Sequence, residues 1–416
     1  MSAPRHPSPL RTRLHRRLLP LHIAVALQGF MLWLPIEKLF MSEIGFDPAA
    51  VGMMAAAYAA LVPVLEVPSG ILADRWSRRG VLIVASIALV LCALIGGLST
   101  DVPTYVVSAL MLGVFFALRS GTMDSIVYDT VLEEIGHSEA FEQTIGRVRV
   151  TESIALVTGS LVGGWTAGLT STRLTYFLTV PFAALSILAY LRFREPQLHR
   201  AGDPTSLRRH LAVTYQVLTR RGQMLPIIAL TVLASVILQL ILEFGPLWLV
   251  ALAAPAVLYG PYWAVLMSTL GLGGLLAGRL PLGRPTTVGA VAAIMTLAGV
   301  ALTTTTSVVV VTIAQAALAL LIVIASIHVT RLLHDAVPSK IRTGVASGAS
   351  AISWMMFLPI ALAFGMVSTE RGVHTAGWIL TALTTLAAVL LVKLSLTNRP
   401  QQLVEEVEAP VESAHS

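Results

Sequence analysis

The stretch GILADRWSRRG occupies residues 70–80 of the chain. A related stretch, GLLAGR, occupies residues 274–279 and matches the first six letters at four positions. The two copies start 204 residues apart, close to half of the 416-residue length, and each closes a long apolar run. This spacing predicts a chain built from two related halves, with the stretch at the end of the second apolar segment of each half.

The composition excludes a water-soluble protein. Hydrophobic residues make up 56% of the chain and charged residues only 12%, whereas soluble domains carry about 25% charged residues. A membrane-spanning helix needs about 20 apolar residues. Twelve segments of this kind run approximately over residues 19–40, 50–73, 81–99, 104–131, 148–169, 174–193, 224–247, 255–278, 287–305, 308–331, 343–367 and 374–396. We therefore expect an all-α polytopic membrane protein with twelve transmembrane helices in two pseudo-symmetric six-helix halves.

Four regions follow from these segments. We expect the N-terminal half to consist of residues 1–193 and a basic cytoplasmic linker to consist of residues 194–223. The C-terminal half takes residues 224–396, and residues 397–416 form a polar tail that we expect to be disordered. The first apolar run continues past any plausible cleavage site of a signal peptide, so we expect it to remain as the first helix.

The positive charges predict the orientation. Lysine and arginine stay on the cytoplasmic side of membrane proteins, and 24 of the 28 fall in stretches on the same side as the N-terminus. Both termini are therefore expected in the cytoplasm, and the net charge of +6 reflects orientation rather than a nucleic-acid partner. The bias of 25 arginines over 3 lysines is typical of a bacterial genome rich in G and C, which predicts a bacterial cell (inner) membrane.

Residues 70–80 resemble the signature of the loop between helices 2 and 3 in the major facilitator superfamily, which reads roughly G-x-L-A-D-R-x-G-R-R/K. Ser77 replaces the second glycine, and the acidic and basic positions match. The resemblance implies the major facilitator fold and a cytoplasmic latch between the halves. The implied latch residues are Gly70, Asp74, Arg75, Arg78 and Arg79, with Asp129 or Glu133 as the acidic partner. The alternative for Arg78 and Arg79 is ordinary anchoring on the positive side of the membrane.

Ionisable side chains inside the predicted helices are costly and mark functional positions. The candidates for proton coupling are Glu66, Arg119, Asp124 and Glu152. Glu66 and Arg119 lie about 17 and about 15 residues from the outer ends of their helices, which predicts an ion pair at one depth. This pair is interpreted either as a static brace or as a proton-sensitive pair, because a carboxyl group in hydrocarbon binds a proton more readily unless a cation offsets it.

A stripe of small and polar residues follows one face of the fourth segment. It consists of Gly113, Ala117, Gly121, Asp124 and Tyr128, at spacings of three and four residues. The stripe indicates either a hydrated cavity in which Asp124 is a proton or cation site, or a packing surface alone.

Drug/proton exporters of this family usually carry a glycine four residues after the arginine of helix 4, and G-P-x-x-G-G in helix 5. Here Gly121 follows Arg119 at two residues. The fifth segment reads GSLVGG over residues 159–164, so the glycines match and Ser160 replaces the proline. The chain therefore departs from the strict exporter pattern at two points.

The resemblance also implies that helices 1, 4, 7 and 10 line a central cavity. Candidate substrate-cavity residues are Gln28, Glu37, Gln239, Glu243 and His328. Amide groups suit a substrate with hydrogen-bonding groups, and the glutamates favour cations, whereas His328 is alternatively a hydrogen-bonded bystander. Lys38 lies near a membrane face, where its amine is expected to reach the surface.

The motifs of several enzyme classes are missing from the sequence. It contains no G-x-x-x-x-G-K-S/T phosphate loop, no H-E-x-x-H and no serine elbow. Its single cysteine, Cys92, excludes a disulfide framework and a cysteine metal site. We therefore expect no enzyme activity, no cofactor and no metal.

The sequence thus predicts a monomeric secondary transporter that works by alternating access in the lipid bilayer. The family resemblance favours proton-coupled efflux of a small organic molecule, of the multidrug type. Uptake of a metabolite is the alternative within transport. A non-transporting membrane sensor or assembly partner is the alternative outside it.

Overall fold

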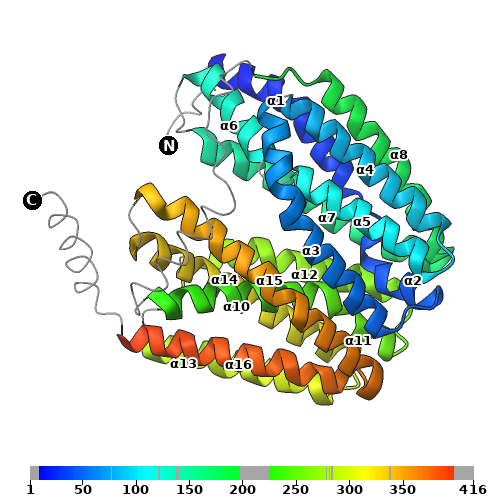
Figure 1. Cartoon of the computed structure of the whole chain (residues 1–416), viewed down its shortest axis with the longest axis vertical. Coiled ribbons are helices and arrows are strands. Elements are labelled where there is room, and N and C mark those ends of the chain that lie inside the picture. Colours follow the sequence, from blue (N-terminus) through cyan, green and yellow to red (C-terminus); the bar gives the residue numbers. More distant parts are fainter. Residues whose placement is uncertain are drawn as a thin grey trace, which may run out of the picture. The chain divides into compact units, whose positions relative to one another are not determined.

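The computed structural model describes residues 9–75, 77–119, 122–136, 140–196, 224–277, 279–280, 282, 284–336 and 339–397. All regular secondary structure within these ranges is helical, as the sequence predicts (Figure 1). Residues 197–223 of the predicted linker and 398–416 of the predicted tail lie outside the described residues.

The N-terminal half supplies helices for six predicted spans. The first span consists of α1 (Pro9–Gly29), the 3-10 turn η1 (Leu34–Ile36) and α2 (Glu37–Glu43). The next three consist of α3 (Pro48–Arg75), α4 (Arg78–Leu98), and α5 (Val102–Arg119) together with α6 (Thr122–Ile135). The last two are α7 (Phe141–Leu169) and α8 (Thr172–Arg192).

The C-terminal half supplies the other six. The first two consist of α10 (Met224–Phe244) with α11 (Pro246–Ala251), and of η3 (Ala256–Leu258) with α12 (Tyr259–Ala277). The remaining four are α13 (Pro285–Thr304), α14 (Val308–Ala336), α15 (Ser339–Arg371) and α16 (Val373–Thr397).

Eleven helical segments in the described ranges are long and apolar enough to cross a membrane. The remaining predicted span, α7, is long enough at 29 residues but less apolar, because its first half carries Arg147, Arg149 and Glu152. Large apolar side chains are exposed on these helices; Leu275 is 71% and Trp165 is 61% exposed. Exposure of this kind fits a surface covered by lipid rather than by water.

The chain folds as two compact units. Unit 1 takes Met1–Ala50, Ala57–Pro204 and Ala254–Met267, and unit 2 takes Val51–Ala56, Thr205–Ala253 and Ser268–Ser416. Unit 1 therefore contains α1 to α8, apart from residues 51–56 of α3, and also η3 and the first part of α12. The domain boundaries predicted near residues 193 and 224 stay a prediction, because residues 197–223 lie outside the described residues.

The core of unit 1 lies where α1, α4, α6, α7 and α8 meet. On α1, Leu14, Leu18, Leu21 and Val25 recur at spacings of three and four residues and are all buried, so one face of this helix points into the core. The other buried members are Ala24, Leu82, Met123, Ile126, Val127, Val131, Val148, Ala189, Tyr190 and Phe193. This core packs together the helices that carry Arg78, Asp129 and Glu152.

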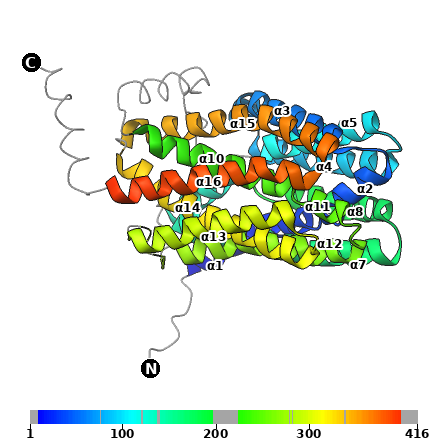
Figure 2. The same cartoon turned by 90° about the horizontal axis from the view of Figure 1, so that it is seen from below.

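Unit 2 is held together by an aromatic cluster. The ring of Phe364 on α15 lies 4.7 Å from that of Phe244 on α10 and 6.0 Å from that of Trp248 on α11, between ring centroids. The indole N–H of Trp248 donates a hydrogen bond to the Leu302 carbonyl oxygen of α13 at 2.8 Å. Helices α13 and α16 run side by side in this unit (Figures 1 and 2).

Glycines allow α7 to approach other backbone segments of unit 1 closely. A Cβ at Gly159 would lie 3.0 Å from the Gly29 carbonyl oxygen, and one at Gly163 would overlap the carbonyl oxygen of Leu32. A Cβ at Gly164 would lie 2.5 Å from the amide nitrogen of Gly260, which belongs to the same unit. The glycines that match the exporter pattern therefore have a packing role.

We expect Gly163→Ala to destabilise the protein by about 1–3 kcal/mol, because the added methyl group overlaps backbone rather than a side chain that can turn away. The matched control is Gly146→Ala on the same helix, where a Cβ meets nothing within 4 Å. It should raise the free energy of unfolding by up to about 1 kcal/mol, since alanine favours a helix. Denaturant titration in detergent micelles measures both. Equal stability of the two variants would contradict the packing role.

Candidate functional site

The start of α4 holds a charged cluster in unit 1. Arg78 Nη1 forms an ion pair with the Asp129 carboxylate on α6 and donates a hydrogen bond to the Ser125 carbonyl oxygen at 3.2 Å. The two charged side chains are mostly buried, with 19% and 17% exposed. Of the two acidic partners considered from the sequence, the structure brings Asp129 to Arg78.

Glu195, just after α8, caps the start of α4. Its Oε1 accepts a hydrogen bond from the Arg78 backbone N–H at 2.6 Å, and its Oε2 accepts one from the Ser77 hydroxyl at 2.6 Å. The unpaired N–H groups at a helix start favour a carboxylate at this position. Sequence reasoning missed Glu195, because 117 residues separate it from Arg78 and no local pattern links the two.

Arg17 on α1 is a second residue of this end of unit 1 that sequence reasoning missed. Its Nη1 lies 3.0 Å from Glu133 Oε1 and 2.7 Å from Glu134 Oε1, both on α6. Its Nε donates a hydrogen bond to the Arg194 carbonyl oxygen at 3.3 Å. The predicted latch residue Glu133 therefore has Arg17 as an ion-pair partner.

The remaining predicted latch residues are only partly described. Arg79 donates a hydrogen bond from Nη1 to the Phe193 carbonyl oxygen at 3.2 Å, after α8. Gly70, Asp74 and Arg75 belong to α3, but their surroundings lie outside the described residues. The latch role itself stays a prediction.

A second charged group includes the buried Arg119 of unit 1. Arg119 is 8% exposed, and its Nη1 lies 2.7 Å from Glu152 Oε1 on α7. Its Nε has no hydrogen-bond partner among the described residues. The guanidinium carbon lies 5.9 Å from the centroid of the Phe115 ring. The predicted pair of Arg119 with Glu66 involves a side chain outside the described residues, and the counter-ion that the structure shows is Glu152.

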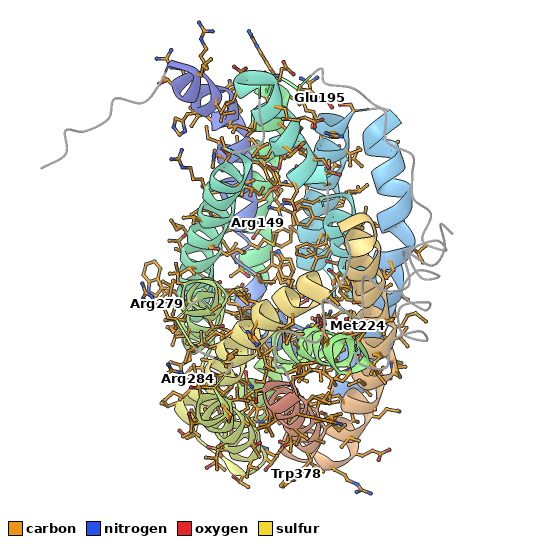
Figure 3. The ribbon with its side chains drawn as sticks, turned by 90° about the vertical axis from the view of Figure 1, so that its left-hand side faces the viewer. Arg149, Glu195, Met224, Arg279, Arg284 and Trp378 are labelled. Carbon is orange, nitrogen blue, oxygen red and sulfur yellow. The ribbon has the colours of Figure 1, made fainter. Side chains whose placement is uncertain are left out.

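Arg149 connects Glu152 to Asp124. Its Nη2 lies 2.9 Å from Asp124 Oδ1, and its Nη1 lies 3.6 Å from Glu152 Oε2. Arg149 and Asp124 are 54% and 47% exposed, whereas Glu152 is 19% exposed. Figure 3 shows Arg149 well away from Glu195 along unit 1. Three of the four predicted proton-coupling residues, Arg119, Asp124 and Glu152, therefore lie in one connected group, which we call the charge network.

Polar side chains continue the charge network into the core. The Tyr190 hydroxyl on α8, which lies within electrostatic range of the Arg119 guanidinium, donates a hydrogen bond to Gln28 Oε1 at 3.3 Å. Gln28 Nε2 donates to the Ser86 hydroxyl on α4 at 3.0 Å. Gln28 is 2% exposed, so this predicted cavity residue makes its hydrogen bonds inside unit 1.

Glu37 belongs to another buried cluster of unit 1. Its Oε2 lies 3.0 Å from Lys38 Nζ, and its Oε1 accepts a hydrogen bond from the Tyr105 hydroxyl at 3.1 Å. The Tyr105 and Tyr176 hydroxyl oxygens are 2.7 Å apart. The side chain of Lys38 is 2% exposed, so the expectation that its amine reaches the surface is wrong. The neighbouring carboxylate supplies the counter-charge that lets the amine stay buried.

Unit 2 carries the other predicted cavity residues. Gln239 Oε1 on α10 is buried and has no hydrogen-bond partner among the described residues. Glu243 and His328 are half-buried, and each takes part in an interaction within the structure. Among the predicted cavity residues of unit 2, Gln239 therefore has a side-chain oxygen that accepts no hydrogen bond from the described residues.

We expect Glu152→Gln to lower the free energy of unfolding by about 3–5 kcal/mol, because Arg119 then stays buried without its counter-ion. Arg119→Gln should cost a similar amount, and the double variant should cost clearly less than the sum. Denaturant titration in detergent micelles gives all three values. Additive losses would contradict a direct interaction of the two side chains.

Asp124→Asn is the matched control for this cycle. It removes the other carboxylate that pairs with Arg149, and both partners of that pair are about half exposed. The loss should therefore stay below about 1 kcal/mol. A loss as large as that of Glu152→Gln would contradict the difference in burial between the two carboxylates.

The fold and the sequence can be compared with known proteins. The bacterial homologue of the human lysosomal transporter Spinster, in an inward-facing and unoccupied conformation, is similar with a TM-score of 0.71 and 14% identity, over 94% of this chain and 98% of that one. The nucleoside transporter NupG is similar with a TM-score of 0.70 and 14% identity, over 92% and 100%. The xylose transporter XylE from E. coli is similar with a TM-score of 0.68 and 15% identity, over 95% and 99%.

These likenesses cover nearly the whole length of each transporter and confirm the predicted fold. No curated protein matches the sequence. The sequence model of the Major Facilitator Superfamily matches residues 18–363, most of the chain. The predicted resemblance is thereby confirmed at the level of the family, and the chain belongs to the major facilitator superfamily.

Proposed function

We propose that the protein is a proton-coupled secondary transporter that moves a small organic molecule across the membrane by alternating access. The observation that carries this proposal is the buried ion pair of Arg119 and Glu152, with 2.7 Å between Nη1 and Oε1. Ionisable groups inside membrane helices are costly and mark ion pathways and proton relays. Membership of a transporter family supports transport as the general activity.

Protonation of Glu152 changes the charge balance of the network. The ionised carboxylate serves Arg119 through one oxygen and Arg149 through the other. A protonated Glu152 leaves the buried Arg119 without its counter-ion, and the Nε of this arginine already lacks a partner among the described residues. A conformation that gives Arg119 an anion or water then becomes favoured, so proton binding is coupled to a change of state.

The exposure of the network supports a route for the proton. Arg149 and Asp124 are about half exposed, and Glu152 is 19% exposed beside them. We infer that the exposed sides of Arg149 and Asp124 face water, so that a proton reaches Glu152 without crossing the apolar core of unit 1.

The cluster at the start of α4 contains Arg78 and Asp129, two residues of the proposed latch, and its contacts lie within unit 1. Arg78 holds α4 to α6 through Asp129, and Glu195 holds the first turn of α4 to the residues after α8. Charge clusters with two alternative arrangements bias an equilibrium between two conformations. We infer that Gly70, Asp74 and Arg75 complete this latch.

We propose efflux as the direction of transport. The support is the glycines at residues 159, 163 and 164, which match the helix 5 pattern of drug/proton exporters. Uptake of a small metabolite is the second candidate, favoured by Ser160 and by the displaced Gly121, which depart from that pattern. The proposed location is a bacterial cell membrane with both termini in the cytoplasm, and the proposed working form is a monomer.

The test uses purified protein in liposomes with an imposed pH gradient. A screen of chemically varied compounds at two external pH values first identifies a transported compound, and the sign of its accumulation gives the direction. Glu152→Gln should then reduce gradient-driven accumulation to the level reached without a gradient. Exchange of labelled for unlabelled compound across the membrane should continue, because exchange needs no net proton movement.

Glu134→Gln is the matched control, since Glu134 pairs with Arg17 outside the charge network. It should retain gradient-driven accumulation. If accumulation persists in Glu152→Gln but stops in Glu66→Gln, Glu66 is the coupling residue; if it persists in both, proton coupling through these glutamates is wrong. No protonophore-sensitive movement of any compound would instead favour the non-transporting sensor.

A further inference from the structure

A groove of about 790 Å³ lies at the end of unit 1 where Glu195 is found in Figure 3. We call it the basic groove, and its charged lining comes from the ends of α1, α4, α6 and α8. It is lined by Arg16, Arg17, Pro20, Arg79, Glu133, Glu134, Arg192, Arg194 and Glu195. Five arginines face three glutamates here, so the lining carries an excess of positive charge.

The glutamates of the basic groove are already engaged. Glu133 and Glu134 both pair with Arg17, and Glu195 accepts hydrogen bonds from Ser77 and from the start of α4. The arginine guanidinium groups that have no hydrogen bond or ion pair among the described residues are those of Arg16, Arg192 and Arg194. The available charge of the groove is therefore cationic.

The adjoining stretches of sequence do not supply the missing negative charge. Residues 197–223 contain five arginines and a single acidic residue, Asp203. Residues 1–8 contain Arg5 and no acidic residue. A negatively charged occupant of the basic groove must therefore come from another part of the chain or from another molecule.

Exposed leucines adjoin these arginines on α1 and α8, two helices that pack together. Leu19 follows Arg16 by three residues and is 48% exposed. Leu188 precedes Arg192 by four residues and is 54% exposed, as is Leu191. Residues three or four apart share one face of a helix. Each helix thus carries an arginine on the groove side (Arg16 on α1 and Arg192 on α8). About one turn away on the same helix it carries an exposed leucine (Leu19 or Leu188).

From this arrangement we propose that the basic groove binds an anionic phospholipid. Arg16, Arg192 and Arg194 hold the headgroup phosphate, and the acyl chains lie over Leu19, Leu188 and Leu191. Guanidinium groups match phosphate oxygens in geometry and charge. A free phosphate ion would use the arginines alone, whereas a phospholipid also covers the exposed leucines.

The test is native mass spectrometry of the purified full chain in detergent, with added phosphatidylglycerol, phosphatidylcholine or inorganic phosphate. The chain should retain phosphatidylglycerol in preference to phosphatidylcholine, whose choline offsets the phosphate charge. Replacing Arg16, Arg192 and Arg194 together by glutamine should weaken phosphatidylglycerol binding by about 100-fold, since each cation near a membrane surface contributes roughly fivefold. Excess inorganic phosphate should not displace the lipid.

The matched control replaces Arg279 and Arg284 by glutamine, two exposed arginines of unit 2 that are labelled in Figure 3. This variant should bind phosphatidylglycerol as the unmodified chain does, and unchanged circular dichroism confirms that both variants fold. Undiminished lipid binding by the triple variant would overturn the proposal. So would displacement by inorganic phosphate, which indicates a soluble anion. Binding that appears only after deletion of residues 400–416, with their four glutamates, would assign the groove to the tail instead.

Discussion

The structure of unit 1 depends on neutralising charge inside an apolar environment. Removing an ion from water costs several kcal/mol, so a buried cation is retained only beside a counter-ion. Arg119 meets Glu152, Lys38 meets Glu37, and Arg78 meets Asp129. The Arg119 and Arg78 pairs each join two helices that are distant in sequence. The charges thereby link α5 to α7 and α4 to α6 through side chains.

Backbone packing and charge pairing support each other around α7. A Cβ at Gly29 would lie 2.5 Å from the Ala155 Cβ and 3.3 Å from the Glu152 carbonyl oxygen. The close approach of α1 and α7 therefore occurs at the residue that pairs with Arg119. Loss of a glycine at this crossing moves Glu152 as well as the helix, so the geometry of the ion pair depends on residues that carry no charge.

The sequence alone predicts the helical spans, because runs of about 20 apolar residues have few alternatives. It also names Asp129 and Glu133 as candidate acidic partners of the latch, and Arg78 pairs with Asp129 in the structure. The sequence does not predict the pairing of Arg119 with Glu152. The number of residues from a helix end gives the depth of a side chain in the membrane, but it does not tell which other helix packs beside that side chain. Lys38 shows a related limit: its position in the sequence suggests a membrane face, while its burial depends on the adjacent Glu37 and on side chains from elsewhere in unit 1.

The contact of Glu195 with the first turn of α4 also has a mechanical consequence. Glu195 lies two residues before residues 197–223, which lead toward α10 in the chain, and it holds the Ser77 hydroxyl and the Arg78 amide. Tension along that stretch is therefore transmitted to α4 through two short hydrogen bonds, and not only to α8, to which the chain is covalently continuous. Strain in the connection between the two halves of the sequence would thus act on the helix that carries Arg78 as well as on α8.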